Sequence, residues 1–211
     1  MIDSNTAAAS PILINPNITI NFGGFGNLQD SLGIQQASDA VGNLLGTGFG
    51  EAVKRVIEDS PLPEFMKDNA SEAIDTAMAE SIRPVPPQAE ADAKEQMQEV
   101  IDQMMEDAFH EMNETTQSTG EGNTANNNGG ENWLAALAKA LGAIAGRHLE
   151  NSVELGKEIT ALSNGETGPG EMAELTAEMQ AETQMFKMAQ EAATTIVKSV
   201  GEALQTTARK Q

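Results

Sequence analysis

Residues 133–162 read WLAALAKALGAIAGRHLENSVELGKEITAL, and residues 171–204 read EMAELTAEMQAETQMFKMAQEAATTIVKSVGEAL. In both stretches apolar side chains return every three or four positions, the spacing that places them on one face of an α-helix. The intervening segment, Ser163 to Gly170, contains three glycines and Pro169, which favour a turn. The pattern predicts two long antiparallel helices that form a hairpin.

The apolar stripe of each arm repeats every seven residues, as in a coiled coil. Each stripe needs a partner helix, and the two arms are the nearest partners for one another. The predicted assembly seam contains Leu134, Leu137, Leu141, Ile144, His148, Leu155 and Leu162 in the first arm, and Met172, Leu175, Met179, Phe186, Ile196, Val200 and Leu204 in the second.

Small side chains flank this seam in both arms: Ala135, Ala138 and Ala145 in the first, and Ala189, Ala192 and Ala203 in the second. Small residues let a third helix approach closely. Two helices alone bury only their facing stripes, so this surface needs further cover. The cover comes either from the N-terminal helices of the same chain or from other subunits, and the sequence leaves both open.

The rest of the chain divides by composition. Residues 1–27 are expected to form a flexible arm with a possible short strand. Residues 28–114 form a predicted acidic helical region with a Pro-rich break, residues 115–130 a low-complexity linker, and residues 131–211 the hairpin. The predicted fold class is all-α, with a long C-terminal coiled-coil-like hairpin beside a smaller N-terminal helical region.

Within that region, glycines and prolines predict short helices over 28–45, 50–59 and 63–81, and a strong helix is expected over 89–114. Each glycine between 42 and 50 costs about 1 kcal/mol relative to alanine in a helix, so the first helix is expected to form only in contact with others. Residues 83–87, RPVPP, predict a stiff extended linker. Their PxxP-like pattern leaves a short ligand for a partner open as the alternative.

The helix expected at 89–114 carries Met97, Met104, Met105 and Met112 on one face. Methionine is flexible and polarizable, so a face rich in it packs adaptably. The face is either an ordinary core surface or a groove for a protein partner along residues 97–112.

The formal net charge is −20, and it is regional. Residues 1–130 hold 21 acidic and 5 basic side chains, a net of −16, whereas residues 131–211 hold 11 and 7, a net of −4. Such a surface repels phosphate and anionic lipid headgroups, so a nucleic acid partner is not expected. The charge either serves solubility or attracts a basic partner.

The composition is poor in catalytic side chains. The chain has no Cys or Tyr, one Trp and two His, and only 3% of its residues are aromatic. His110 has Glu106 and Glu114 at helical spacing, but paired Glu-x-x-His elements of a di-iron bundle are missing. The sequence predicts a non-enzymatic protein, with no catalytic, cofactor-binding or metal-binding residues.

His148 lies in the predicted seam between Leu141 and Leu155. One reading is a partly buried packing residue, and the alternative is a switch that loosens packing on protonation. Asn151 and Ser152 occupy the positions three and four residues later, so zinc ligation is not expected.

Neither a cleaved signal peptide nor a transmembrane segment is expected. The N-terminus lacks a basic region followed by an apolar core, and no run of 18 apolar residues occurs. Membrane contact through the second arm, with Met179, Phe186 and Val200 on a bilayer surface, remains an alternative.

Three segments resemble extracellular substrates of bacterial type III secretion, of the harpin-like or needle and filament type. They are the Ser/Asn/Thr-rich start from Met1 to Ser10, the Gly/Asn tract from Gly120 to Gly130, and the amphipathic helix from Glu171 to Arg209. The chain departs from harpins in its 19 glycines, a modest number, and in its long middle helices.

This resemblance implies a secreted structural or surface-acting protein. We expect it to be a homo-oligomer that self-assembles through its C-terminal hairpin. The alternatives are a secreted protein that contacts membranes or host surfaces, and an intracellular helical adaptor or assembly scaffold.

Overall fold

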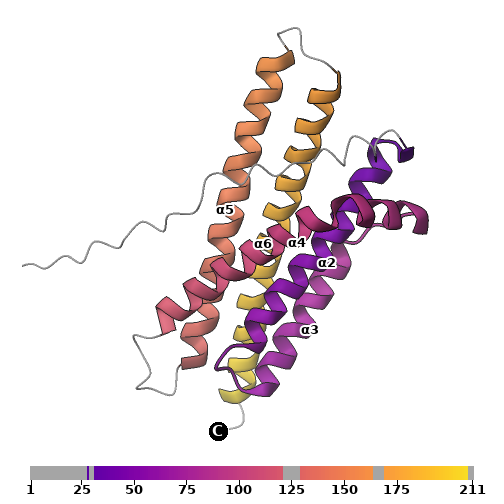
Figure 1. Cartoon of the computed structure of the whole chain (residues 1–211). Coiled ribbons are helices and arrows are strands. Elements are labelled where there is room, and N and C mark those ends of the chain that lie inside the picture. The colour runs from indigo at the N-terminus through magenta and orange to yellow at the C-terminus, as the bar shows by residue number, and fades with distance from the viewer. Residues whose placement is uncertain (1–27, 29–30, 121–128, 164–168, 209–211) are drawn as a thin grey trace, which may run out of the picture.

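The computed structural model describes residues 28, 31–120, 129–163 and 169–208. The described part is all-helical, and its long helices are α2 (Ile34–Glu58), α3 (Glu64–Ser81), α4 (Pro87–Gly120), α5 (Gly129–Ser163) and α6 (Pro169–Ala208). Helices α5 and α6 run antiparallel as an elongated hairpin (Figure 1). The predicted all-α class and the hairpin are confirmed. The arm expected at residues 1–27, with its possible strand, lies outside the described residues.

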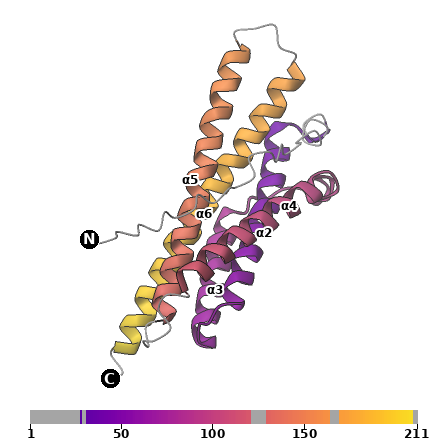
Figure 2. The ribbon, with the colours of Figure 1, turned by 60° about the vertical axis from the view of Figure 1, so that its left-hand side comes forward.

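The N-terminal helices cover only part of the hairpin. Helix α2 packs against α3, α4 and α6, and α4 also packs against α5. Together they lie against the end of the hairpin where α5 begins and α6 ends (Figures 1 and 2). The connected end, where α5 finishes and α6 starts, projects beyond them in both views. The same chain therefore supplies the cover for the base of the hairpin, and the tip consists of two helices only.

Helix α2 is continuous through the glycines that were expected to break it. It runs for 25 residues, whereas the sequence predicted two helices separated at 46–49. A Cβ added at Gly48 would lie 2.8 Å from Cγ of Met105 in α4, and one at Gly50 would lie 3.0 Å from Cγ of Met78 in α3. Glycine thus lets two helices approach α2 closely, and their packing offsets its low helix propensity.

Helix boundaries elsewhere differ less from the prediction. Helix α3 begins at Glu64, directly after Pro63, which was expected to open it. Helix α4 runs on to Gly120, so the first six residues of the predicted linker at 115–130 are helical. Thr116 explains part of this extension, because it is buried and its hydroxyl donates to the carbonyl of Asn113 at 3.0 Å.

The core lies where α2, α3 and α4 meet the base of the hairpin. Its largest fully buried side chains come from all five helices and include Phe49, Ile74, Met97, Leu141 and Met185. One contiguous set of buried residues links them. The hairpin base and the N-terminal helices therefore share a single core rather than forming two separate units.

Candidate functional site

The first arm of the predicted seam is largely buried within the chain. Leu134, Leu137, Leu141 and Ile144 are covered, and Leu155 is also buried. Leu162, near the tip, is half-buried. Most of this arm's seam is thus already used to build the monomer and is not open to a second copy.

In the second arm the buried face agrees only in part with the predicted one. Ile196 is buried as predicted, but Phe186 is only half-buried, whereas Met185, Met188, Ala189 and Ala192 are buried. Helix α6 packs against α5, α3 and α2 at once, so its covered face is wide and turned toward the N-terminal helices. The side chains of Val200 and Leu204 lie outside the described part of the structure.

The projecting tip is less well packed than the base. Its seam residues Leu162, Met172, Leu175 and Met179 are all half-buried. No third helix of the described chain lies against the connected end of the hairpin in either view (Figures 1 and 2), whereas α2 reaches α6 beside Met179, where the hydroxyl of Ser38 donates to Oε1 of Gln180. This half-burial is what two helices can achieve alone, since each covers only one stripe of the other.

An uncharged strip runs along α5 on the side opposite the seam. We call it the outer stripe, and it consists of Gly142, Gly146, Leu149 and Val153, at successive spacings of four, three and four residues. Leu149 is 45% exposed and Val153 is 51% exposed. A Cβ added at either glycine would meet nothing within 4 Å. Large apolar side chains and two open notches therefore share one solvent-facing strip of helix.

The alanines that were expected to admit a third helix divide between surface and core. Ala135 is exposed and Ala138 is half-buried, on the side of α5 that continues the outer stripe. Ala145 is buried. In α6, Ala189 and Ala192 are buried as well. The small-residue surface predicted for a third helix is thus covered at these positions of α6 and open in part on α5.

His148 lies in the interior of the hairpin beside a carboxylate. Its Nδ1 is 2.5 Å from Oε2 of Glu182, which is only 4% exposed, and Nδ2 of Asn151 donates to Oε1 of the same carboxylate at 3.4 Å. This geometry supports the interpretation of His148 as a partly buried packing residue with a polar partner on the facing helix.

Arg147 joins the hairpin to α4. Its guanidinium forms an ion pair with Glu111 of α4, and its buried Nε has no hydrogen-bond partner in the described structure. Burial lowers the pKa of Arg147 from its usual value, against the opposing effect of the negative charges of Glu182 and Asp107. Arg147 and Glu111 thus place a charge pair where α4 meets the hairpin.

Neither histidine belongs to a metal cluster. Nε2 of His110 lies 3.3 Å from Oε1 of Glu106, and both side chains are substantially exposed. Among the described residues, no group of three or more His, Cys, Asp and Glu side chains could hold a metal ion.

The methionine face of α4 lies in the core. Met97, Met104, Met105 and Met112 are all buried. Helices α2 and α5 pack against this helix. The predicted partner groove along 97–112 is therefore occupied by the chain's own helices in this conformation.

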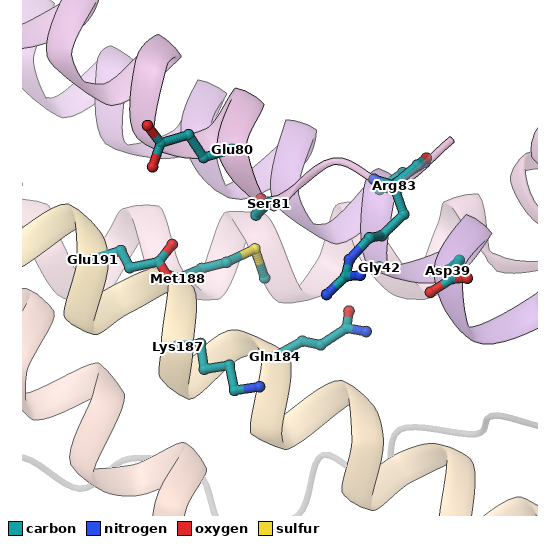
Figure 3. A pocket seen from close by; sticks show the side chains of 10 residues that line it. Asp39, Gly42, Glu80, Ser81, Arg83, Gln184, Lys187, Met188 and Glu191 are labelled. Atoms are coloured by element: carbon teal, nitrogen blue, oxygen red, sulfur yellow. The ribbon is translucent and has the colours of Figure 1, made fainter. Parts of the chain in front are cut away.

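A groove of about 290 Å³ lies where α2, the end of α3 and α6 meet. Arg83, from the linker between α3 and α4, and Gln184 of α6 point toward one another across it (Figure 3). Lys187, Met188 and Glu191 of α6 line the same groove. Gly42 makes room for Gln184, because a Cβ there would lie 2.5 Å from its Oε1.

The linker is held in place at this groove by one side chain. Nδ2 of Asn43 donates to the carbonyl of Arg83 at 2.7 Å, and the backbone N–H of Arg83 donates to Oδ1 of Asn43 at 2.8 Å. Asn43 is only 8% exposed. No sequence pattern predicted this groove, although Gly42, Gly46 and the polar Asn43 between them mark its place.

Comparison with known proteins identified no relative of this chain. No protein-family model, no curated protein and no solved structure matches this chain.

Proposed function

We propose that this protein is a non-enzymatic helical protein that self-assembles through its hairpin, and that the outer stripe of α5 is the contact. The observation that carries the proposal is the combination of Leu149 and Val153, both about half exposed, with the open notches at Gly142 and Gly146. A helix from another copy could approach these notches closely and cover the two large side chains.

Charged side chains of both signs border this stripe on α5. They are the exposed Lys139 and Lys157, and an acidic row of Glu150, Glu154 and Glu158 at four-residue spacing. The chain as a whole carries −20, which opposes association at long range. Salt should therefore strengthen assembly by screening the general repulsion while leaving the apolar contact intact.

The seam predicted from the heptads is a less suitable contact. Its residues at the base are buried inside the monomer, so their use by a second copy would require the hairpin to open. The outer stripe needs no such rearrangement.

Secretion is part of the same proposal and rests on the resemblance to type III secretion substrates. Among the described residues, none of the helices has the length and apolarity needed to cross a bilayer. Appearance of the protein in culture medium without cell lysis would support export, and its retention in the cell pellet would favour the scaffold alternative.

The test uses two valines that differ only in their place on the surface. Val153 belongs to the outer stripe, whereas Val197 lies on α6 and is 60% exposed. Sedimentation velocity over a concentration series should show association of the wild type, loss of it in Val153→Glu, and wild-type behaviour in Val197→Glu. A wild type that stays monomeric at every concentration, or equal effects of the two substitutions, would overturn the assignment.

Negative-stain electron microscopy of the same samples would show the form of the assembly. Regular filaments or closed rings are expected for the wild type and for Val197→Glu. Dispersed small particles are expected for Val153→Glu.

A further inference from the structure

The groove between α2, α3 and α6 is built without α5, so it is independent of the proposed assembly contact. Its volume of about 290 Å³ lies at the lower limit of ligand pockets, which range from about 300 to 1,000 Å³. The groove therefore suits a small molecule or the end of a longer chain.

Two cations that line the groove, Arg83 of the linker and Lys187 of α6 on the facing wall, have no ion-pair partner in the described part of the chain. Among the described residues, Arg83 and Lys187 form no ion pair, as is also true of Lys94, Lys139, Lys157 and Lys198, which lie outside the groove. The half-buried amide of Gln184 lies opposite the guanidinium of Arg83 and makes no hydrogen bond within the described structure (Figure 3). Three groups that can donate hydrogen bonds thus border the same space and are not used by the protein itself.

Carboxylates also line the groove. Glu80 and Glu191 contribute to its wall beside Met188, and Asp39 lies at the opposite edge, beyond Arg83 (Figure 3). Neither glutamate forms an ion pair with a described residue. With Arg83 and Lys187 the lining carries two positive and three negative side chains, a net charge of −1. A polyanion would be repelled by this lining, and a simple cation would meet Arg83 and Lys187.

We propose that this groove binds a small zwitterion that carries a carboxylate and an ammonium group, such as a free amino acid or the charged end of a peptide. The carboxylate pairs with the guanidinium of Arg83 and the ammonium of Lys187, with Gln184 donating a further hydrogen bond. The ammonium of the ligand faces Glu191. Met188 supplies the apolar wall between the two groups.

The preorganisation of Arg83 supports this assignment. Asn43 holds both backbone groups of Arg83, so the residue is fixed at the groove although it belongs to a linker. A binding residue with a fixed backbone loses less conformational freedom when the ligand arrives. The side chain of Arg83 is exposed, so a ligand can reach it.

The experiment is a titration of the ¹⁵N-labelled full chain followed by heteronuclear NMR. The probes are glycine, β-alanine, γ-aminobutyrate and ε-aminocaproate, whose charges are progressively farther apart, with acetate and methylammonium as single-charge controls. Saturable shifts at the amides of Arg83, Gln184 and Lys187 are expected for at least one zwitterion, with weaker binding of acetate and of methylammonium.

Two substitutions test separately the side chains proposed to bind the carboxylate and the ammonium group of the ligand. Arg83→Gln leaves the backbone contacts with Asn43 intact and should weaken the best zwitterion about tenfold or more. Glu191→Gln should weaken the zwitterion but strengthen acetate, because it removes a negative charge beside Lys187. Lys198→Gln, on an exposed part of α6 away from the groove, should change neither.

Three outcomes would overturn the proposal. They are the absence of saturable shifts with every probe, equal affinity for acetate and for all zwitterions, and an equal effect of Lys198→Gln and Arg83→Gln. Each of these leaves the assembly proposal untouched, since none of these residues belongs to the outer stripe.

Discussion

The Nδ1 atom of His148 in α5 lies 2.5 Å from a carboxylate oxygen of Glu182 in α6, in the interior of the hairpin. Helical hairpins of apolar residues can slide by a turn or a heptad, and a buried polar pair opposes such shifts because every other register leaves its members unpaired. The pair therefore defines which turn of α5 faces which turn of α6.

Removal of the carboxylate tests this pair. Glu182→Ala should lower the free energy of unfolding by about 1 to 3 kcal/mol, because His148 and Asn151 lose a buried acceptor. The double variant His148→Leu with Glu182→Leu should recover much of that loss, since it replaces both partners by apolar groups. Urea unfolding of the two single leucine variants and the double variant measures the coupling. Additive losses would show that the two side chains do not act as a pair.

Two glycines should respond in opposite directions to the same substitution. Gly142→Ala should stabilise the monomer by about 1 kcal/mol, because the position is helical and open. Gly48→Ala gains the same helix propensity but places a Cβ 2.8 Å from Cγ of Met105, and overpacking of this kind costs about 1 to 3 kcal/mol. Thermal unfolding at a low protein concentration compares the stabilities of the two variants. A clear gain for Gly48→Ala would mean that α4 can shift away from α2 at little cost.

Asn43 should control the order of the linker. Asn43→Ala removes both hydrogen bonds to the backbone of Arg83 and should cost about 1 to 2 kcal/mol, with faster hydrogen exchange at the Arg83 amide. Asn43→Asp keeps an acceptor for that amide, so protection of Arg83 should be better preserved than in the alanine variant. Equal exchange in all three proteins would contradict the role assigned to Asn43.

Lys54 should contribute a pH-dependent link between α2 and α3. Its ammonium lies 2.6 Å from a carboxylate oxygen of Glu51 and 2.9 Å from one of Asp75, and these contacts raise the pKa of Lys54 above 10.5. Because the folded state holds the proton more tightly, this contribution is present below pH 10.5 and is lost as the pH rises through the higher folded value.

Both carboxylates are well exposed, so the size of this effect is about 0.2 to 1 kcal/mol. Lys54→Met should be less stable than the wild type at neutral pH, and the difference should shrink at an alkaline pH above the raised pKa of Lys54. Urea unfolding of both proteins at the two pH values measures this difference in stability. A difference that stays constant would assign the loss to the packing of the lysine stem instead.

Much of the helix content was predictable because it depends on local periodicity. The spacing of Leu137, Leu141 and Ile144 identifies a buried face of α5 whatever the partner is, and Pro63 marks the start of α3. The continuity of α2 was not predictable in this way. Gly48 and Gly50 lower helix propensity, and only the close approach of Met105 and Met78 explains why the helix continues.

The candidate sites were less accessible to sequence reasoning. Heptad counting placed Phe186 in the seam, whereas the wider contact of α6 with three helices buries Met185 and Met188 instead. The groove brings Arg83 of a linker opposite Gln184, about a hundred residues later in the chain. No spacing rule relates two such positions.

By itself, the sequence determined that this chain is helical, acidic and built around a long hairpin, because helix periodicity, charge and turn residues are properties of neighbouring positions. The tertiary structure alone decided which stripe of each helix is covered. Burial depends on how many helices pack against a face, so three helices on the hairpin base enclose the predicted seam, while the outer stripe of α5 and the groove beside α6 remain open to solvent.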